Sequence, residues 1–289
     1  MAIKRKTKTS VDSRGSAPLK IVPVPKPVPA KEGWAPVRGG RVWYWDTGGR
    51  GQAVVFVHPN AGSSLSWAYQ QPAFARAGYR AVGYSRRNYY KSDLAPRNDP
   101  GIASEDLHDL IEYLGLGQVH MVSAAAGGGV ATDYAVSHPD RLRSLAIVSR
   151  TAGIRKGPVA RAVAALKPPQ WKDLPRWFQE LGPSYRAANP EGVRRWIEIN
   201  RKSEARKGGG HQKSANVITR ETLAKLAVPT LLMTGTADFT APPSVVREVA
   251  RNIPGSELVV VPGAGHSIYW EQPETFNAVV LAFIARHAG

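Results

Sequence analysis

Short runs of continuously apolar residues alternate along the chain with stretches whose apolar residues recur at helical spacing. Residues 53–57 are apolar at every position, which is typical of a central parallel strand covered on both faces. Residues 103–114 repeat Leu or Ile every three or four positions, as one face of a helix does. Similar strands are predicted at 42–45, 79–84, 118–122, 142–148, 229–233 and 257–261, and helices that end near 76, 138, 252 and 287. The alternation predicts an α/β fold with a doubly wound, mostly parallel sheet.

This alternation breaks over residues 154–225. The span holds three tryptophans (Trp171, Trp177 and Trp196), a basic helical stretch and a Gly-rich segment. We interpret it as a helical lid inserted over the strand ends, so that residues 33–153 and 226–289 form the folded body. Residues 1–32 are rich in Lys and Pro, which favours polyproline II over a hydrogen-bonded ladder. They are predicted to form an extended, poorly packed arm.

The formal charge of +17 is concentrated in these two irregular segments. Residues 1–32 contain 8 Lys or Arg against 2 Asp or Glu, and residues 154–225 contain 16 against 6. The rest of the chain contains 15 against 14. Because the body is close to neutral, we expect no nucleic-acid partner. The arm is either solvated or contacts an acidic surface.

Several classes of chemistry are disfavoured by what the chain lacks. It has no cysteine, which rules out disulfides, thiol nucleophiles and cysteine metal ligands. No apolar run approaches the roughly 20 residues of a membrane span, and no apolar signal segment follows the basic start, so a cytoplasmic location is expected. The seven histidines show no metal-ligand spacing, and the triple glycine lacks the Lys-Ser/Thr of a phosphate-binding loop. We expect neither a metal nor a cofactor.

One stretch, Ser123-Ala124-Ala125-Ala126-Gly127-Gly128-Gly129, places very small residues between an apolar strand and an apolar helix. Small neighbours allow a sharp strand-to-helix turn from which one strained residue projects. The stretch resembles the nucleophile elbow of the α/β-hydrolase superfamily, which reads G-x-S-x-G and often carries a second Gly. Gly127 and Gly128 set the register, so Ser123 takes the first-Gly position and Ala125 takes the nucleophile position.

The resemblance extends over residues 41–287 and implies two further catalytic positions. Asp238 follows a predicted strand where the family keeps its triad acid, and His266 follows the last strand where the family keeps its base. In such a triad His266 removes a proton from the nucleophile, while Asp238 fixes the imidazole tautomer and stabilises the imidazolium. Elbow, acid and base occur here in the family's order.

An oxyanion hole needs two backbone N–H groups directed at the developing negative charge. The resemblance assigns one to Ala126, the residue after the nucleophile position. The other comes from the loop after the first central strand, which reads His58-Pro59-Asn60 where relatives commonly have His-Gly-x. Because Pro59 has no N–H, the donor expected here is Asn60.

Four further residues are candidates for substrate contact. Arg86 and Arg87 lie where relatives often carry Asp-x-Arg-Gly, and a structural salt bridge is the competing role for each. Trp171 and Trp177 belong to the predicted lid. The basic lid suggests that the small-molecule substrate is acidic, although a solvated outer face would explain the same charges.

Three interpretations of Ala125 stay open. The active protein has Ser at position 125 and this chain carries an alteration; or the chain is a natural binding protein; or His266 serves proton abstraction or a lyase reaction. An Asp–His pair with an oxyanion loop serves a nucleophile and is not needed for binding alone. We therefore interpret the chain as a serine-type hydrolase of a carboxylic ester or lactone, inactive because position 125 is Ala. Amide or carbon–carbon bond hydrolysis would use the same residues.

Overall fold

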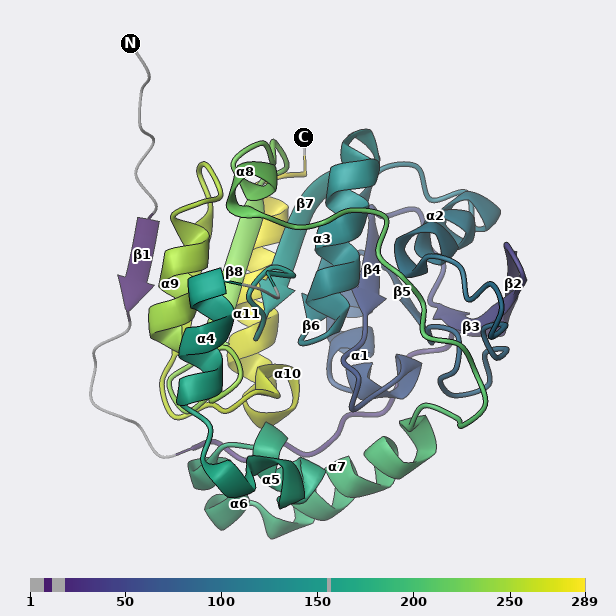
Figure 1. Cartoon of the computed structure of the whole chain (residues 1–289). Helices are drawn as coiled ribbons and strands as arrows, with labels where there is room; N and C mark the ends of the chain where they lie inside the picture. Colours follow the sequence, from purple (N-terminus) through teal and green to yellow (C-terminus); the bar gives the residue numbers. More distant parts are fainter. Residues whose placement is uncertain (1–7, 12–18, 155–156, 289) are drawn as a thin grey trace.

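A nine-stranded sheet forms the centre of the computed structural model, which describes residues 8–11, 19–154 and 157–288 (Figure 1). The strand order is β1-β9-β8-β7-β6-β4-β5-β3-β2. The strands are β1 (Lys8–Val11), β2 (Lys31–Val37), β3 (Gly40–Asp46), β4 (Ala53–Val57), β5 (Arg80–Tyr84), β6 (Val119–Ala124), β7 (Leu142–Val148), β8 (Thr230–Gly235) and β9 (Glu257–Val261). The pairs β2–β3 and β3–β5 are antiparallel and all other neighbours are parallel. The predicted mostly parallel sheet is confirmed.

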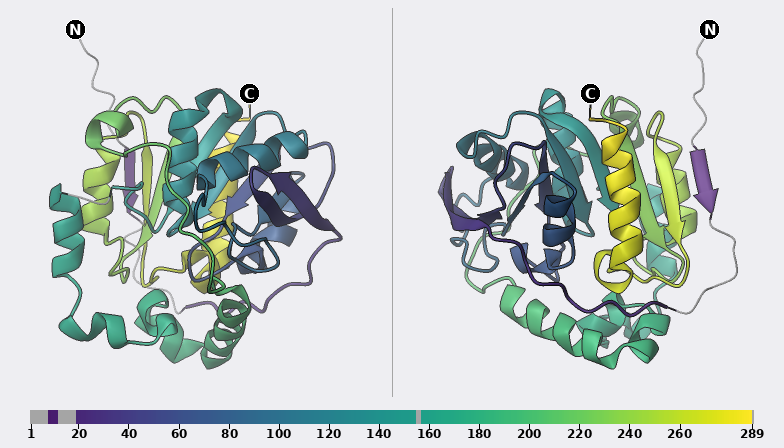
Figure 2. Two further views of the ribbon diagram at one scale, coloured as in Figure 1. Left: turned by 45° about the vertical axis from the view of Figure 1, so that its right-hand side comes forward. Right: turned by 180° about the vertical axis from the view of Figure 1, so that it is seen from behind.

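Both faces of the sheet are covered, because successive side chains of a strand point to opposite sides. Val55 and Val57 of β4 belong to one buried cluster, and Val54 and Phe56 belong to the other. Helices α2 (Ala103–Tyr113), α3 (Gly127–Ser137) and α9 (Pro243–Ala250) contribute to the first cluster, and α1 (Gln70–Arg76) and α11 (Pro273–Ala285) to the second. The opposed views of Figures 1 and 2 show these two helical layers. The doubly wound arrangement follows from strands that are apolar at every position.

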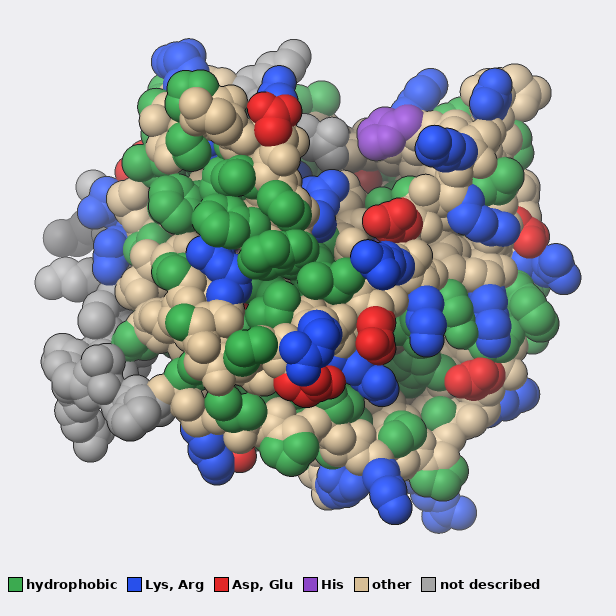
Figure 3. Space-filling model, turned by 90° about the horizontal axis from the view of Figure 1, so that it is seen from below, with side chains coloured by type: hydrophobic (Ala, Val, Ile, Leu, Met, Phe, Trp, Pro, Cys, Tyr) green, Lys and Arg blue, Asp and Glu red, His purple; other side chains and the backbone are tan. Residues whose placement is uncertain are grey.

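The chain between β7 and β8 contains the helices of the span that we propose as the lid. They are α4 (Gly157–Ala165), η3 (Pro169–Asp173), α5 (Arg176–Glu180), α6 (Pro183–Ala188), α7 (Pro190–Ser203) and α8 (Arg220–Leu223). Helices α5, α6 and α7 lie beneath the ends of the strands, toward which the arrows of β4 and β6 point (Figures 1 and 2). Figure 3 looks onto this end of the molecule and shows Lys and Arg side chains spread among hydrophobic ones.

The predicted arm differs from the structure in two places. Residues Lys8–Val11 form β1, which pairs in parallel with β9, and β2 begins at Lys31. An edge strand presents unpaired backbone groups that a further segment can meet, which explains why a charged, Pro-rich segment can contribute a strand. The parts of the arm at 1–7 and 12–18 lie outside the described residues.

The segment from residue 19 to residue 30 has no regular structure but lies against the helices of the second layer. The hydroxyl of Tyr69 donates to the Val22 carbonyl over 2.8 Å, and the Gln71 amide exchanges two hydrogen bonds with the Val28 backbone. Lys20 forms an exposed ion pair of 2.8 Å with Glu274 of α11. This part of the arm is therefore attached to the body by backbone and side-chain hydrogen bonds.

Three short helices lie in the connections that have not yet been described. They are η1 (Ser64–Trp67), after β4, and α10 (Ile268–Glu271), directly after the loop of His266; η2 (Pro139–Arg141) joins α3 to β7. In the described part of the chain, none of the helices combines the length and hydrophobicity that a membrane span requires.

Candidate active site

Ala125 occupies a sharp turn between β6 and α3, as expected for the nucleophile position. Its φ of 47° lies in the left-handed region, which is costly for a residue with a Cβ and is concentrated at functional sites. The turn is fixed from both sides, because Ala125 N–H donates to the Val148 carbonyl and Gly128 N–H donates to the Ala125 carbonyl, each over 2.9 Å. Ser123 lies earlier, inside β6, where its hydroxyl donates to the Ala146 carbonyl over 2.8 Å. The register deduced from the glycines therefore places Ala125, and not Ser123, at the turn.

The glycines behind the turn allow α3 to start very close to β4. A Cβ at Gly127 would lie 2.2 Å from the carbonyl oxygen of Val57 and 2.7 Å from that of His58. Both contacts are with backbone atoms, which cannot move aside as a flexible side chain can. Close packing of backbone against backbone thus explains this glycine without a bound phosphate.

Asp238 and His266 lie on neighbouring loops and form a direct pair. Asp238 follows β8 and His266 follows β9, and these two strands pair in parallel, so their carboxyl ends meet at one edge of the sheet. Nδ1 of His266 lies 2.8 Å from Oδ2 and 2.9 Å from Oδ1 of Asp238. The N–H groups of Thr240 and Ala241 donate to Oδ1 over 2.7 and 2.8 Å and hold the carboxylate in place. The geometry is that expected of a base and the acid that orients it.

The charged and hydrogen-bonded partners of this pair together outweigh burial, which is the largest single influence on the pKa of each group. Burial by itself disfavours the charged form of His266, but the carboxylates of Asp238 and Glu180 raise its pKa to about 9. Burial also disfavours ionised Asp238, but His266 and the two backbone donors lower its pKa below the ordinary value. The arrangement therefore favours an imidazolium beside a carboxylate, and His266 becomes a base as the pH rises through its pKa.

Asn60 and Ala126 carry the two N–H groups assigned to the oxyanion hole. Neither backbone N–H donates a hydrogen bond within the parts of the chain that the structure describes. The loops that hold them are adjacent, because β4 and β6 pair in parallel up to Val57 and Ser123. Both N–H groups are thus available to a ligand.

His58 supports the loop of Asn60 as a neutral imidazole. Its Nε2 accepts from the Arg86 N–H over 2.9 Å, so its Nδ1 carries the proton and donates to the Pro59 carbonyl over 2.7 Å. Burial, and then the charge of Arg86, lower the pKa of His58 well below its ordinary value. His58 is fully buried, and its role is to join the loop after β4 to the loop after β5.

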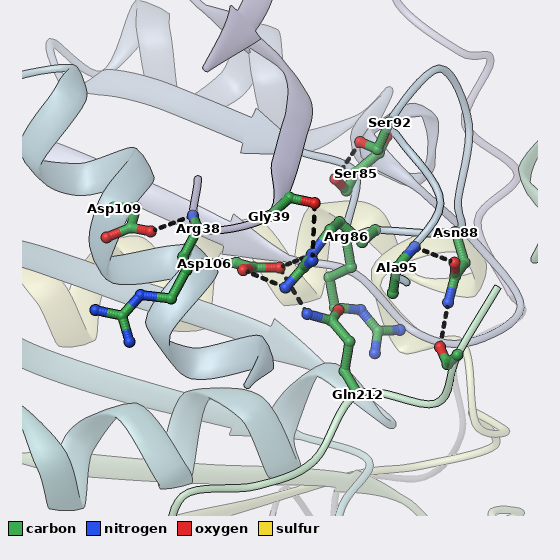
Figure 4. A network of polar contacts seen from close by, with 12 residues as sticks. Arg38, Gly39, Ser85, Arg86, Asn88, Ser92, Ala95, Asp106, Asp109 and Gln212 are labelled. Carbon is green, nitrogen blue, oxygen red and sulfur yellow. Dashed lines mark hydrogen bonds and ion pairs between the residues drawn. The ribbon is translucent and has the colours of Figure 1, made fainter. Parts of the chain in front are cut away.

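Arg86 and Arg87 are adjacent in sequence but have different partners. Nε and Nη2 of Arg87 donate to the two carboxylate oxygens of Asp106 over 2.7 and 2.8 Å, and Gln212 adds a third donor to the same carboxylate. Figure 4 shows this buried network, with the Asp106 carboxylate beside the Gln212 amide and the Gly39 carbonyl accepting from the guanidinium. The guanidinium of Arg87 is therefore committed to a structural ion pair.

Arg86 has no such carboxylate partner among the described residues. Its Nη2 donates to Oδ1 of Asn60 over 2.8 Å, its guanidinium lies 4.8 Å from the ring centre of Tyr89, and its buried Nε has no hydrogen-bond partner there. Only 9% of Arg86 is exposed. Among the residues that the structure describes, this buried cation beside the loop of Asn60 thus has no countercharge.

Of the two tryptophans proposed for substrate contact, Trp171 lies beside the loop of the acid. Its ring centre is 5.6 Å from that of Phe239, the residue after Asp238. The Nζ of Lys167 lies 5.7 Å from the same indole. Trp177 instead forms an edge-to-face pair with Phe178 on α5 and packs against the second hydrophobic cluster. The substrate contacts of both tryptophans stay a prediction.

Two buried glutamates near His266 were not predicted from the sequence. Glu180 ends α5, and Glu271 ends α10. Carboxylates at helix ends are common on surfaces, so sequence alone gives no reason to single them out. Burial raises the pKa of Glu271 to about 7, while three backbone N–H donors oppose this shift. Within the described ranges, no group of three or more His, Asp or Glu side chains has the arrangement of a metal site.

Comparison with known proteins assigns the family. The model for the alpha/beta hydrolase fold matches residues 52–273, and the chain belongs to this family. A 2-hydroxy-6-oxononadienedioate/2-hydroxy-6-oxononatrienedioate hydrolase of Burkholderia vietnamiensis is 26% identical over 278 residues, which cover 85% of this chain and 91% of that protein. A bifunctional esterase/perhydrolase of Acinetobacter calcoaceticus is 26% identical over 267 residues, covering 85% of this chain and 96% of that protein.

The fold is also that of solved structures. A thermophilic esterase from Thermogutta terrifontis, solved with malate bound, has a TM-score of 0.72 at 22% identity. The match covers 90% of this chain and 100% of the esterase chain. At this identity the likeness concerns the fold.

Proposed function

We propose that this site is that of a serine-type hydrolase acting on a carboxylic ester or lactone, with Ser at position 125 in the active form and Ala in this chain. The observation that carries the proposal is the left-handed turn at Ala125. Such strain contributes nothing to the start of a helix, but it is the conformation that projects a nucleophile from an elbow. The esterase named among the relatives supports the ester class.

Each retained group has a role in that reaction. The hydroxyl of Ser at position 125 attacks the carbonyl carbon, and Nε2 of His266 takes the hydroxyl proton. The N–H groups of Asn60 and Ala126 bind the oxyanion, and Asp238 stabilises the imidazolium. His266 then gives its proton to the leaving alcohol, and an acyl-enzyme forms. Water, deprotonated by the now neutral His266, releases the acid and regenerates the serine.

The substrate is proposed to carry an acidic group. Arg86 is a buried cation without a carboxylate partner in the described structure, and it hydrogen bonds to the side chain of Asn60. Lys167 of the proposed lid is a second cation on the side of the Asp238–His266 pair. Burial lowers its pKa, and the nearby charges of Asp238 and Glu180 raise it. A carboxylate on the substrate would supply the countercharge that Arg86 lacks in the described structure.

The test is to introduce Ser into this chain. Ala125→Ser should raise the rate of short-chain aryl ester hydrolysis by at least about 10³-fold, because losing a triad nucleophile costs on the order of 10⁶ in subtilisin. Adding His266→Ala to this variant should return the rate to that of the unchanged chain, since the residues act as a unit. Circular dichroism controls for folding. A well-folded Ala125→Ser protein that hydrolyses no ester, lactone or amide would refute the proposal.

A second candidate follows from Ala125 itself. A base, its orienting acid and two free N–H donors are sufficient to remove a proton next to a carbonyl and hold the resulting enolate. This lyase or proton-transfer chemistry would need no serine. It predicts that the unchanged chain exchanges such protons in heavy water and that His266→Ala abolishes the exchange. If neither hydrolysis nor exchange occurs, a non-catalytic binding role is favoured.

A further inference from the structure

One residue of the proposed lid is bonded directly to the backbone of the base. The carbonyl of Glu180, the last residue of α5, accepts from the N–H of His266 over 2.8 Å and from the N–H of Ser267 over 3.1 Å. These bonds join two segments that lie more than 80 residues apart in the chain. The backbone of Glu180 is therefore held directly against the backbone of the base.

The carboxylate of Glu271 also joins the loop of His266 to the chain that follows Glu180. Its Oε2 accepts from the N–H groups of Gly182 and Gly265, each over 2.9 Å, and its Oε1 accepts from the N–H of Ser267 over 3.1 Å. The two glycines approach so closely that a Cβ on Gly265 would lie 2.4 Å from the nitrogen of Gly182. The chain of the proposed lid after Glu180 is thus packed against the loop of His266, backbone against backbone.

The carboxylate of Glu180 lacks a full countercharge of its own. Glu180 is 8% exposed, and its Oε1 lies 3.9 Å from Nη1 of Arg176, beyond hydrogen-bond distance. Its buried Oε2 has no hydrogen bond of good geometry in the described part of the chain, although the hydroxyl of Ser267 is near enough to lower its pKa. An unpaired buried charge is costly unless another charge compensates it. Arg176 at 3.9 Å does so only in part, and His266, whose backbone N–H is bonded to the Glu180 carbonyl, is a further cationic group that acts on this carboxylate.

We propose that Glu180 is a positioning residue for the base: a second carboxylate, contributed by the lid, which acts with Asp238 to stabilise the protonated form of His266. The inference rests on the proposed function, in which His266 carries the proton during catalysis. Asp238 binds Nδ1 and fixes the ring, whereas Glu180 acts through its charge and makes no hydrogen bond to the ring. The lid then contributes to the strength of the base as well as covering the site.

The pKa shifts have the direction that this arrangement requires. Burial raises the pKa of Glu180, and His266, followed by Arg176, opposes that rise; Glu180 in turn raises the pKa of His266. The charged and titratable groups that act on this pair are Asp238, Arg150, Arg176, Lys167 and Tyr269. Removing the charge of Glu180 should therefore make His266 lose its proton at lower pH.

The direct test is proton NMR titration of the His266 imidazole in the unchanged chain and in Glu180→Gln. The His266 signal is assigned by its absence in His266→Gln. We expect the unchanged His266 to titrate well above the ordinary histidine value, and Glu180→Gln to lower its pKa by about one unit. The exposed Glu191→Gln on α7 is the matched control and should leave the titration unchanged.

Two further variants separate this role from a structural one. Arg176→Gln should leave the pKa of His266 unchanged or raise it, since it removes a cation that competes for Glu180. Glu180→Asp keeps the charge and should give a smaller shift than Glu180→Gln. If folded Glu180→Gln titrates like the unchanged chain, or if His266 of the unchanged chain already titrates at the ordinary histidine value, the inference is wrong.

The same substitution can be followed in activity. In the Ala125→Ser background, Glu180→Gln should move the acidic limb of the kcat/KM profile to lower pH by about one unit. If Ala125→Ser hydrolyses nothing, the proposed function fails, but the NMR titration still decides the role of Glu180.

Discussion

The two sides of the candidate site have opposite chemical character. On the side of the elbow, Ala125, Ala126 and Asn60 present a methyl group and two N–H groups, held by a strained backbone. On the other side, His266 and Asp238 form a buried charged pair. The first side can bind negative charge that develops on a substrate, and the second can hold a proton.

The difference between the two sides shows what this chain retains and what it lacks. The groups that would stabilise an oxyanion and a transferred proton in the proposed reaction are both present. The proposed hydrolysis also requires a hydroxyl that supplies the proton and attacks the substrate, and one oxygen atom on Ala125 would provide it. The predictions below test each side separately, in the background of Ala125→Ser where activity is the readout.

The largest effect is expected on the charged side. Asp238→Asn should lower the kcat of Ala125→Ser by about 10⁴-fold, because the amide favours the wrong tautomer of the base, as the equivalent change does in trypsin. Ester hydrolysis is the measurement. Asp173→Asn, at an exposed position of η3, is the control and should have no effect. A loss of less than tenfold with Asp238→Asn would remove Asp238 from the triad.

The next effect is a dependence on pH with a defined sign. With a pKa of about 9, His266 is neutral in roughly one molecule in a hundred at pH 7. The kcat/KM of Ala125→Ser should therefore rise about tenfold per pH unit from pH 7 and level off near pH 9. A flat profile above pH 7 would contradict the charge arrangement around His266.

The same shift predicts how stability varies with pH. Because the folded pKa of His266 lies above the ordinary 6.5, its protonated form stabilises the fold fully below about pH 6.5. That contribution is lost as the pH rises through about 9. Urea unfolding at both ends of the range, with His266→Gln as the control, would measure it.

A smaller effect is expected from the packing of the elbow. Gly127→Ala should destabilise the protein by roughly 1–3 kcal/mol, because its Cβ would meet two backbone carbonyls. The matched control is Gly129→Ala in the same helix, where the nearest atom to a Cβ is 3.8 Å away. This control should stabilise the protein by up to about 1 kcal/mol. Equal unfolding free energies for the two variants would show that the close approach at Gly127 is not needed.

The smallest effect concerns the basic groups near the site. Raising the salt concentration should weaken binding of an acidic ester by Ala125→Ser a few-fold and leave a neutral analogue unchanged, since exposed charges are screened over about 8–10 Å. Lys167→Gln should reduce this response, and the exposed Lys225→Gln should not. Equal salt responses for acidic and neutral esters would refute an electrostatic preference.

Much of the body could be predicted from sequence because its patterns are local. The run 53–57 is apolar throughout and became the central strand β4, and the Leu and Ile spacing at 103–114 became α2. The turn at Ala125 is also predictable from the sequence, since only small residues tolerate a sharp strand-to-helix turn. By contrast β2, with Lys31, Glu32 and Pro36, shows no alternation and was missed. An edge strand has one unpaired side and tolerates Pro, so its sequence is weakly constrained.

The residues of the candidate site also differ in whether a local sequence pattern predicts them. The sequence by itself determined the turn at Ala125 and the placement of Asp238 and His266 after strands, because each lies within or beside a local pattern. Only the tertiary structure decided that Arg87 pairs with Asp106 while Arg86 does not. It alone decided that Glu180 is buried against His266. A charge takes its function from its burial and its partners, and these come from segments that are distant in the chain and are brought together only by folding.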